Sequence, residues 1–192
     1  MLKTESDIIR VIQDDHKMMD ILKTVQHLNL PDWWICAGFI RSKIWDTIHE
    51  FKEATALPDV DVIYFDSENK SQVFEKGLEG TLNAAHPGVP WSVKNQARMH
   101  LLNNVTPYKS SVDAISKFPE TATALGVKLS IKGKLIVTTP CGIDDVLQCK
   151  VKPTAYFMAT KERMNIYNNR MLRKNWPLIW PNVKVQYMTN SS

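Results

Sequence analysis

An apolar run that opens with two spaced carboxylates limits the possible folds of this chain more than any other segment. The run Asp59-Val60-Asp61-Val62-Ile63-Tyr64-Phe65-Asp66 is rich in β-branched and aromatic residues, which is typical of a buried strand. Side chains alternate across a strand, so we expect Asp59 and Asp61 on one face, roughly 7 Å apart along it. The segment therefore predicts a central strand with two carboxylates at its mouth.

Paired carboxylates at this position suit a divalent cation that prefers hard oxygen ligands, such as Mg²⁺ or Mn²⁺. Such a cation commonly holds phosphate groups, so the pair predicts phosphoryl or nucleotidyl transfer with Asp59 and Asp61 as metal ligands and catalytic residues. The alternative is that both are solvated carboxylates at a strand end. Asp66 has no such partner, and we expect it to cap a helix that begins near residue 70.

The length of 192 residues fits a single domain, 1–192. Within it we expect an N-terminal helix at about 4–28, a core at about 33–149 and a basic C-terminal helical segment at about 150–187. The sequence has no signal-peptide pattern and no apolar run long enough to span a bilayer, and its three cysteines lack zinc-like spacing. These features predict a cytoplasmic protein without membrane contact.

Periodicity predicts helices and strands that mix without strict alternation, which favours an α+β fold with a small mixed sheet flanked by helices. Turn residues at Lys132-Gly133-Lys134 predict a hairpin between the fourth and fifth strands. Strands are expected at 33–37, 59–66, 91–93, 127–131, 135–139 and 183–187. Helices are expected at 4–28 with Ser6 as the cap, and at 39–52, 70–85, 95–102, 143–147 and 156–175. Four tryptophans are expected in the core: Trp33, Trp34, Trp45 and Trp91.

Basic residues concentrate near the C-terminus. From Lys150 onward there are eight Lys or Arg residues and one acid, Glu162. A basic segment beside an acidic site suits a nucleotide or a polyanion, and a nucleic-acid-binding module that uses Arg170, Arg173 and Lys174 is one possible function. The alternative is a solvated basic helix, and no nucleic-acid readout motif is present.

Two of these segments resemble a known superfamily. Residues 37–42, Ala-Gly-Phe-Ile-Arg-Ser, followed by the strand at 59–62, resemble the signature of polymerase-β-like nucleotidyltransferases. In that superfamily a glycine motif opens a helix, and an acidic pair follows on the next strand. The head domains of CCA-adding enzymes carry the related motif Gly-Gly-x-hydrophobic-Arg-Asp. Gly38, Ile40 and Arg41 match this motif, whereas Ala37 and Ser42 depart from it.

Three further segments, 91–100, 118–123 and 140–145, are similar to a bacterial family of uncharacterised nucleotidyltransferase-like proteins. The resemblance extends over roughly 33–187. It implies a polymerase-β-like fold, a nucleoside triphosphate bound with Mg²⁺, and transfer of a nucleotidyl group to an unidentified acceptor.

Six residues near these motifs are expected to contact the nucleotide or the second substrate. Gly38, Arg41 and Ser42 lie at a helix start, where backbone N–H groups and a charged side chain suit phosphate. Lys94, Asn95 and Arg98 form a polar cluster after a strand, with Lys94 and Arg98 four residues apart and therefore on one helix face. We expect this cluster to contact phosphates or the second substrate; the alternative is a solvated face.

A third carboxylate completes the metal site in this superfamily, and its position falls near Ser92, which is not an acid. This departure leaves open a catalytically degenerate protein that binds nucleotide or a protein partner without turnover. Asp144 and Asp145 are adjacent acids at a predicted helix start, where we expect them to cap the helix and pair with its dipole.

Overall fold

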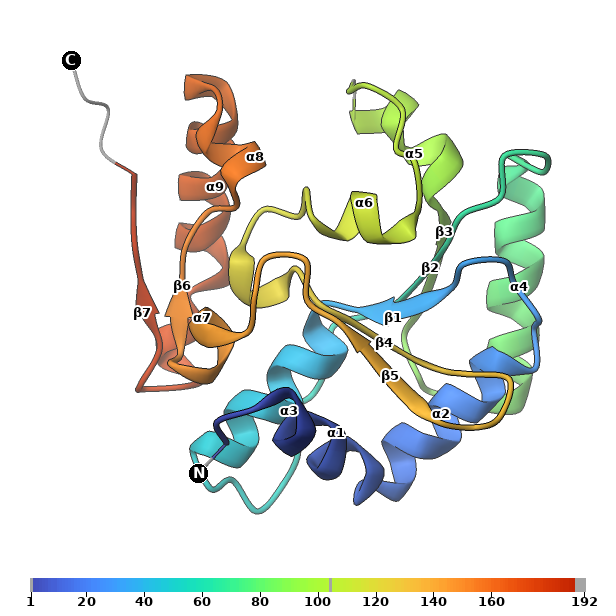
Figure 1. Cartoon of the computed structure of the whole chain (residues 1–192), viewed down its shortest axis with the longest axis horizontal. Helices are drawn as coiled ribbons and strands as arrows, with labels where there is room; N and C mark the ends of the chain where they lie inside the picture. Colours follow the sequence, from blue (N-terminus) through green and yellow to red (C-terminus); the bar gives the residue numbers. More distant parts are fainter. Residues whose placement is uncertain (1, 104, 189–192) are drawn as a thin grey trace.

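The structure, a computed structural model, describes residues 2–103 and 105–188 and contains a five-stranded mixed sheet flanked by helices (Figure 1). The strand order is β3-β2-β1-β4-β5, with β2 and β3 parallel and the other neighbours antiparallel. The strands are β1 (Trp34–Cys36), β2 (Val60–Tyr64), β3 (Trp91–Asn95), β4 (Gly126–Leu129) and β5 (Leu135–Thr138). The predicted α+β class is confirmed.

Four helices cover one face of this sheet. They are α1 (Glu5–Gln13), α2 (His16–Gln26), α3 (Gly38–Ile48) and α4 (Gln72–Ala85). Val60, Val62 and Tyr64 of β2 point into this layer and are almost completely buried. Because side chains alternate, the acidic positions of β2 face the other way.

The opposite face is covered more thinly. Trp34, Cys36 and Ile63 pack against Ile115 of the short helix α6 (Ser111–Ile115) in a small second cluster. The helix α5 (Gln96–Asn103) continues directly from β3. This face therefore keeps room in front of β2 and β3 for a site.

The C-terminal segment packs beside the N-terminal half of the core (Figure 1). The Trp45 ring of α3 contacts Trp176 and Trp180 edge-on, and its indole N–H donates to the carbonyl of Val146. The segment contains β6 (Lys150–Val151), α8 (Ala155–Met158), α9 (Lys161–Lys174), a 3-10 turn at Trp176–Leu178 and β7 (Lys184–Val185). The helix α7 (Asp144–Leu147) precedes it, and a second 3-10 turn, Thr121–Thr123, lies before β4. Of the helices described, none is both long and apolar enough to cross a membrane.

The prediction of one N-terminal helix over 4–28 is wrong, because the chain forms two helices. Thr4, and not Ser6, caps α1 in a capping box with Asp7. Asp15 then caps α2 by accepting a hydrogen bond from the Met18 N–H. Asp14 and Asp15 break the helix because a short carboxylate satisfies free backbone N–H groups at a helix start.

Two other predicted details differ. The helix expected at 156–175 is split into α8 and α9, because Thr160 caps α9. Ser71 caps α4, whereas Asp66 accepts from the N–H groups of Glu68 and Asn69 in the preceding turn. The strand β6 has no counterpart in the prediction, while the hairpin, α7 and the burial of all four tryptophans are confirmed.

Gly126 provides a test of core packing. A Cβ atom there would lie 3.1 Å from Ile115 Cδ1, 3.2 Å from Thr138 Cγ2 and 3.3 Å from Cys36 Sγ. We expect Gly126→Ala to lower the free energy of unfolding by about 1–3 kcal/mol, because overpacking forces neighbours out of place. Urea denaturation measures this change.

Gly80→Ala in the exposed face of α4 is the matched control, since nothing lies within 4 Å of the added atom. We expect it to raise the free energy of unfolding by about 0.5–1 kcal/mol, because alanine loses less entropy in a helix. Equal effects of both substitutions would contradict the packing described around Gly126.

Candidate functional site

Asp59 and Asp61 lie on the same face of the sheet, at the start of β2. Asp59 is exposed and Asp61 is partly buried. Burial and then the nearby charge of Asp59 raise the pKa of Asp61 to about 6. Ser92, which is the register partner of Asp61 on β3, donates a hydrogen bond that opposes this rise. The two carboxylates therefore repel one another, and a bound cation would reduce this repulsion.

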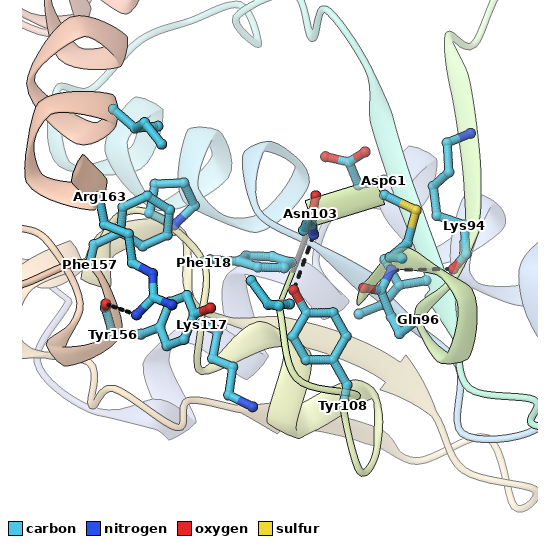
Figure 2. A pocket seen from close by; sticks show the side chains of 15 residues that line it. Asp61, Lys94, Gln96, Asn103, Tyr108, Lys117, Phe118, Tyr156, Phe157 and Arg163 are labelled. Carbon is cyan, nitrogen blue, oxygen red and sulfur yellow. Dashed lines mark hydrogen bonds between the residues drawn. The ribbon is translucent and has the colours of Figure 1, made fainter. Parts of the chain in front are cut away.

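A cavity of about 430 Å³ opens in front of Asp61 (Figure 2). This volume lies within the usual range for small-molecule sites. Asp61 and Lys94 line one side, and residues that follow α6 or belong to α8 and α9 line the other. The lining residues that Figure 2 labels are Asp61, Lys94, Gln96, Asn103, Tyr108, Lys117, Phe118, Tyr156, Phe157 and Arg163.

Most of this wall was not predicted from the sequence. Phe118 lies in a segment that carries the family resemblance, but Tyr156, Phe157 and Arg163 lie in no motif. In the structure the Arg163 guanidinium stacks on the Tyr156 ring, 3.8 Å from its centroid. The local sequence gives one weak indication of this cavity wall: two adjacent aromatic residues followed by an arginine in the first turn of the next helix. That pattern is also common where such residues only pack in a core.

The start of α3 lies beside the acidic pair, because Cys36 at the end of β1 is the register partner of Asp61. Ala37 occupies the position where the related motif has glycine, with φ 53° and ψ −116°, a conformation that glycine adopts more readily. Among the described residues, no acceptor is found for the N–H groups of Gly38 and Phe39. A Cβ at Gly38 would make ordinary van der Waals contacts with Arg41 Nη2 at 3.8 Å and Leu57 Cδ2 at 4.0 Å, so an alanine would fit there without displacing its neighbours.

Arg41 is buried rather than presented to solvent. Its guanidinium lies 4.9 Å, 4.4 Å and 4.9 Å from the ring centroids of Trp45, Trp176 and Trp180. Its Nη2 donates to the Ser42 hydroxyl, which is also buried. Burial lowers the pKa of Arg41 to about 10, although nearby carboxylates including Asp59 oppose this. Arg41 is therefore a buried positive charge close to Asp59 and is not exposed at the surface of the site.

Arg170 supplies a second positive charge to the site. Its Nε donates to the carboxylate of Glu120, which is fully buried and also accepts from the Thr123 hydroxyl. Arg170 lies close enough to Asp61 for its charge to lower the pKa of that carboxyl. The basic C-terminal segment thus reaches the acidic site through Arg170.

Asn95 and Arg98, which were predicted to contact substrate, are held in structural contacts. The Asn95 side chain is fully buried and bonds the backbone of Asp66, Asn69 and Ala97. Arg98 forms two bonds to the buried carboxylate of Glu75. These contacts fix the turn after β2 and the start of α5. Lys94, by contrast, lines the cavity while it pairs with Glu79 at 3.2 Å.

The third carboxylate of the related superfamily has no counterpart among the residues described. No group of three or more His, Cys, Asp or Glu in this part of the chain is arranged to hold a metal. Asp145 pairs with Lys152 at 2.8 Å and accepts from the Thr121 hydroxyl. Asp144 and Asp145 lie in the first turn of α7, but the N-cap residue is Ile143 and no side chain caps this helix, so the predicted capping is wrong.

Comparisons with known proteins agree with the resemblance seen in the sequence. A family model described as nucleotidyltransferase matches residues 23–185. A solved NMR structure, described as revealing a CCA-adding enzyme head domain, is 33% identical with a TM-score of 0.88. That match covers 98% of each chain. The fold that the resemblance predicts is confirmed.

Two solved structures of CCA-adding enzymes share this fold at lower identity. The complex with ATP is 12% identical with a TM-score of 0.53, and an apo form is 10% identical with a TM-score of 0.54. These matches cover 93% of this chain but only 43% and 42% of the enzymes, so the chain spans less than half their length. A comparison with curated proteins finds no match.

Replacement of Arg98 tests its structural role. We expect Arg98→Met to lower the free energy of unfolding by about 3 kcal/mol, because the Glu75 carboxylate, 1% exposed, would lose its charged partner. Lys94→Met is the control, since that lysine is 32% exposed and its pair is worth less than about 1 kcal/mol. Chemical denaturation of both variants measures the difference, and equal losses would contradict a structural role specific to Arg98.

The raised pKa of Asp61 predicts a pH-dependent stability. Folding favours the protonated carboxyl, so the free energy of unfolding of the unmodified protein falls as the pH rises from about 4 towards 6. Asp61→Asn removes this ionisation. We expect the variant to be more stable than the unmodified protein above pH 6, with the difference vanishing towards pH 4.

Urea denaturation of both proteins at a series of pH values, without divalent cations, measures this difference. A stability difference that stays constant from pH 4 to pH 8 would show that the Asp61 carboxyl titrates normally.

Proposed function

Because the chain belongs to the nucleotidyltransferase family, we propose that it binds a nucleoside triphosphate with a divalent cation and transfers a nucleotidyl group to an acceptor. The observation that carries this proposal is the position of Asp59 and Asp61, which stand on the open face of the sheet beside the start of α3. An acidic pair next to free backbone N–H groups suits a metal–triphosphate complex.

The residues present fit a divalent cation. Asp59, Asp61 and the Ser92 hydroxyl offer hard oxygen ligands on one face, and the mutual repulsion of the carboxylates favours a cation between them. Mg²⁺ or Mn²⁺ bound there would neutralise phosphate charge and stabilise the leaving pyrophosphate. We propose Asp59 and Asp61 as its ligands.

The chain's own groups support the triphosphate in three ways. The N–H groups of Gly38 and Phe39 offer hydrogen bonds at the positive end of α3. Arg170 and Lys94 carry positive charge towards Asp61, and Arg41 adds charge from beneath α3. An acceptor oxygen would attack the α-phosphorus as the bond to pyrophosphate breaks, so one nucleotidyl group is transferred and one pyrophosphate is released.

We further propose that the chain works as one domain. The C-terminal segment contributes Arg163 to the cavity that Asp61 lines and places the charge of Arg170 near Asp61, while Trp176 and Trp180 pack against Trp45 of α3. The phosphate-binding start of α3 and the basic helix α9 are therefore expected to act together.

A second candidate is a protein that binds nucleotide without turnover. The hydroxyl of Ser92 beside Asp61 favours this candidate, because it carries no negative charge where the related superfamily has a carboxylate. Two carboxylates can hold a metal–nucleotide complex more weakly than three. Binding and turnover must therefore be measured separately.

Titration with ATP, GTP, CTP and UTP, with and without Mg²⁺, tests the proposal through backbone amide signals. We expect metal-dependent shifts around Gly38, and we expect Asp59→Ala with Asp61→Ala to reduce affinity at least about tenfold, because the ligands that hold the metal are lost. Gly38→Ala should fold normally, since its Cβ would make only ordinary van der Waals contacts, and its nucleotide affinity tests whether the phosphates need a glycine at this helix start.

Asp144→Ala is the matched control for the acidic variants, because this exposed carboxylate lies on α7 and outside the site. Absence of metal-dependent binding for all four nucleotides would overturn the proposal. Where binding is found, release of pyrophosphate with candidate acceptors distinguishes an enzyme from a nucleotide-binding protein.

A further inference from the structure

We infer that the cavity wall formed by Phe118, Tyr156 and Arg163 binds the nucleobase of the triphosphate. This inference rests on the proposed function. It adds a binding site for the base of the nucleotide to the proposed site for its phosphates. It also gives α8 and α9 a role in substrate recognition that no motif in the sequence indicates.

The lining of the cavity suits a flat, partly polar group. Away from Asp61 its wall is largely apolar and aromatic, with the rings of Phe118, Tyr156 and Phe157 on one side and Tyr108 on another (Figure 2). A nucleobase has a flat π-face that packs on such rings and polar edges that need hydrogen-bond partners. Phosphate, by contrast, gains nothing from an aromatic wall.

Arg163 differs from the other cations near this cavity. Lys94 pairs with Glu79, Lys117 with Asp113, and Arg170 with Glu120. Within the described residues, Arg163 has no carboxylate partner; its Nη1 donates to the carbonyl of Tyr156 at 3.3 Å. Its remaining N–H groups are available to acceptor atoms on the edge of a base.

The Tyr156 side chain supports the same assignment. Its ring carries the Arg163 guanidinium on one face, 3.8 Å from the centroid, which holds the arginine in a fixed orientation. Its hydroxyl is buried and has no hydrogen-bond partner among the described residues. A buried hydroxyl without a partner is costly, so a polar ligand atom near this wall would be favoured.

The direction of the ligand follows from the acidic pair. Figure 2 shows Arg163 across the cavity from Asp61 and Lys94. If the phosphates lie at Asp59, Asp61 and the start of α3, the nucleoside extends into the cavity and its base reaches the aromatic wall. Arg163 then acts as a residue that binds the base and not the phosphates.

Comparison of two probes separates base binding from phosphate binding. Affinities for each nucleoside triphosphate and for inorganic tripolyphosphate, both with Mg²⁺, are measured by calorimetry. We expect Arg163→Ala and Tyr156→Ala to weaken nucleoside triphosphate binding about tenfold, because stacking and edge contacts are lost, and to leave tripolyphosphate binding unchanged. Tyr156→Phe keeps the ring and removes the hydroxyl, so we expect it to weaken nucleoside triphosphate binding less than Tyr156→Ala does.

Arg173→Ala is the matched control, since it removes an exposed arginine from the same helix outside the cavity. Amide spectra and thermal unfolding establish that each variant is folded. If Arg163→Ala is not folded, Arg163→Gln, which retains a polar side chain, takes its place, and Tyr156→Phe is used if Tyr156→Ala is not folded. We expect Arg173→Ala to leave the affinity for both probes unchanged.

The other outcomes overturn the inference. If Arg163→Ala weakens the binding of both probes equally, this residue contacts phosphate and not the base. If it weakens the binding of neither probe, Arg163 does not belong to the site. If the unmodified protein binds tripolyphosphate as tightly as every nucleoside triphosphate, the base site fails while the phosphate site stands. If it binds neither probe, the proposed function fails, and the base site with it.

Discussion

The alternation of side chains along β2 is the constraint on which the rest of the structure depends. Val60, Val62 and Tyr64 anchor the four-helix layer on one face, so Asp61 must stand on the other. A shift of the register by one residue would place carboxylates in the core and apolar residues in the site. The alternation from Asp59 to Tyr64 therefore determines both the position of the core and the position of the acidic pair.

Several charges near this strand are buried, and each is stabilised by a specific neighbour. Arg41 lies among three tryptophan rings, two of them from the C-terminal segment, and Glu120 binds Arg170 from α9. Buried charges without such partners are strongly destabilising. The C-terminal segment thus completes the environment of α3 and delivers cations to the cavity, which relates the stability of this region to its proposed function.

Much of the fold and half of the site could be predicted from local patterns. The period-2 run of β2, the Lys132-Gly133-Lys134 hairpin and the acidic pair are encoded by residues close in sequence. The errors arose where short side chains competed with the backbone, as Asp15 and Thr160 do when each starts a new helix. The sequence could not show that the Asn95 side chain binds the turn after β2, because a polar residue after a strand suits a ligand and a loop equally well.

The amino-acid sequence alone determined the strand that carries Asp59 and Asp61 and the helix that starts at Gly38, since both follow from nearest-neighbour patterns and a family resemblance. Tertiary packing determined which cations face that strand and which aromatic residues close the cavity. Arg163 and Tyr156 lie about a hundred residues from Asp61 in the chain, and no local periodicity records a contact of that separation. Packing of Trp176 and Trp180, which follow α9, against Trp45 of α3 holds the C-terminal segment beside the core and so brings these residues to the cavity.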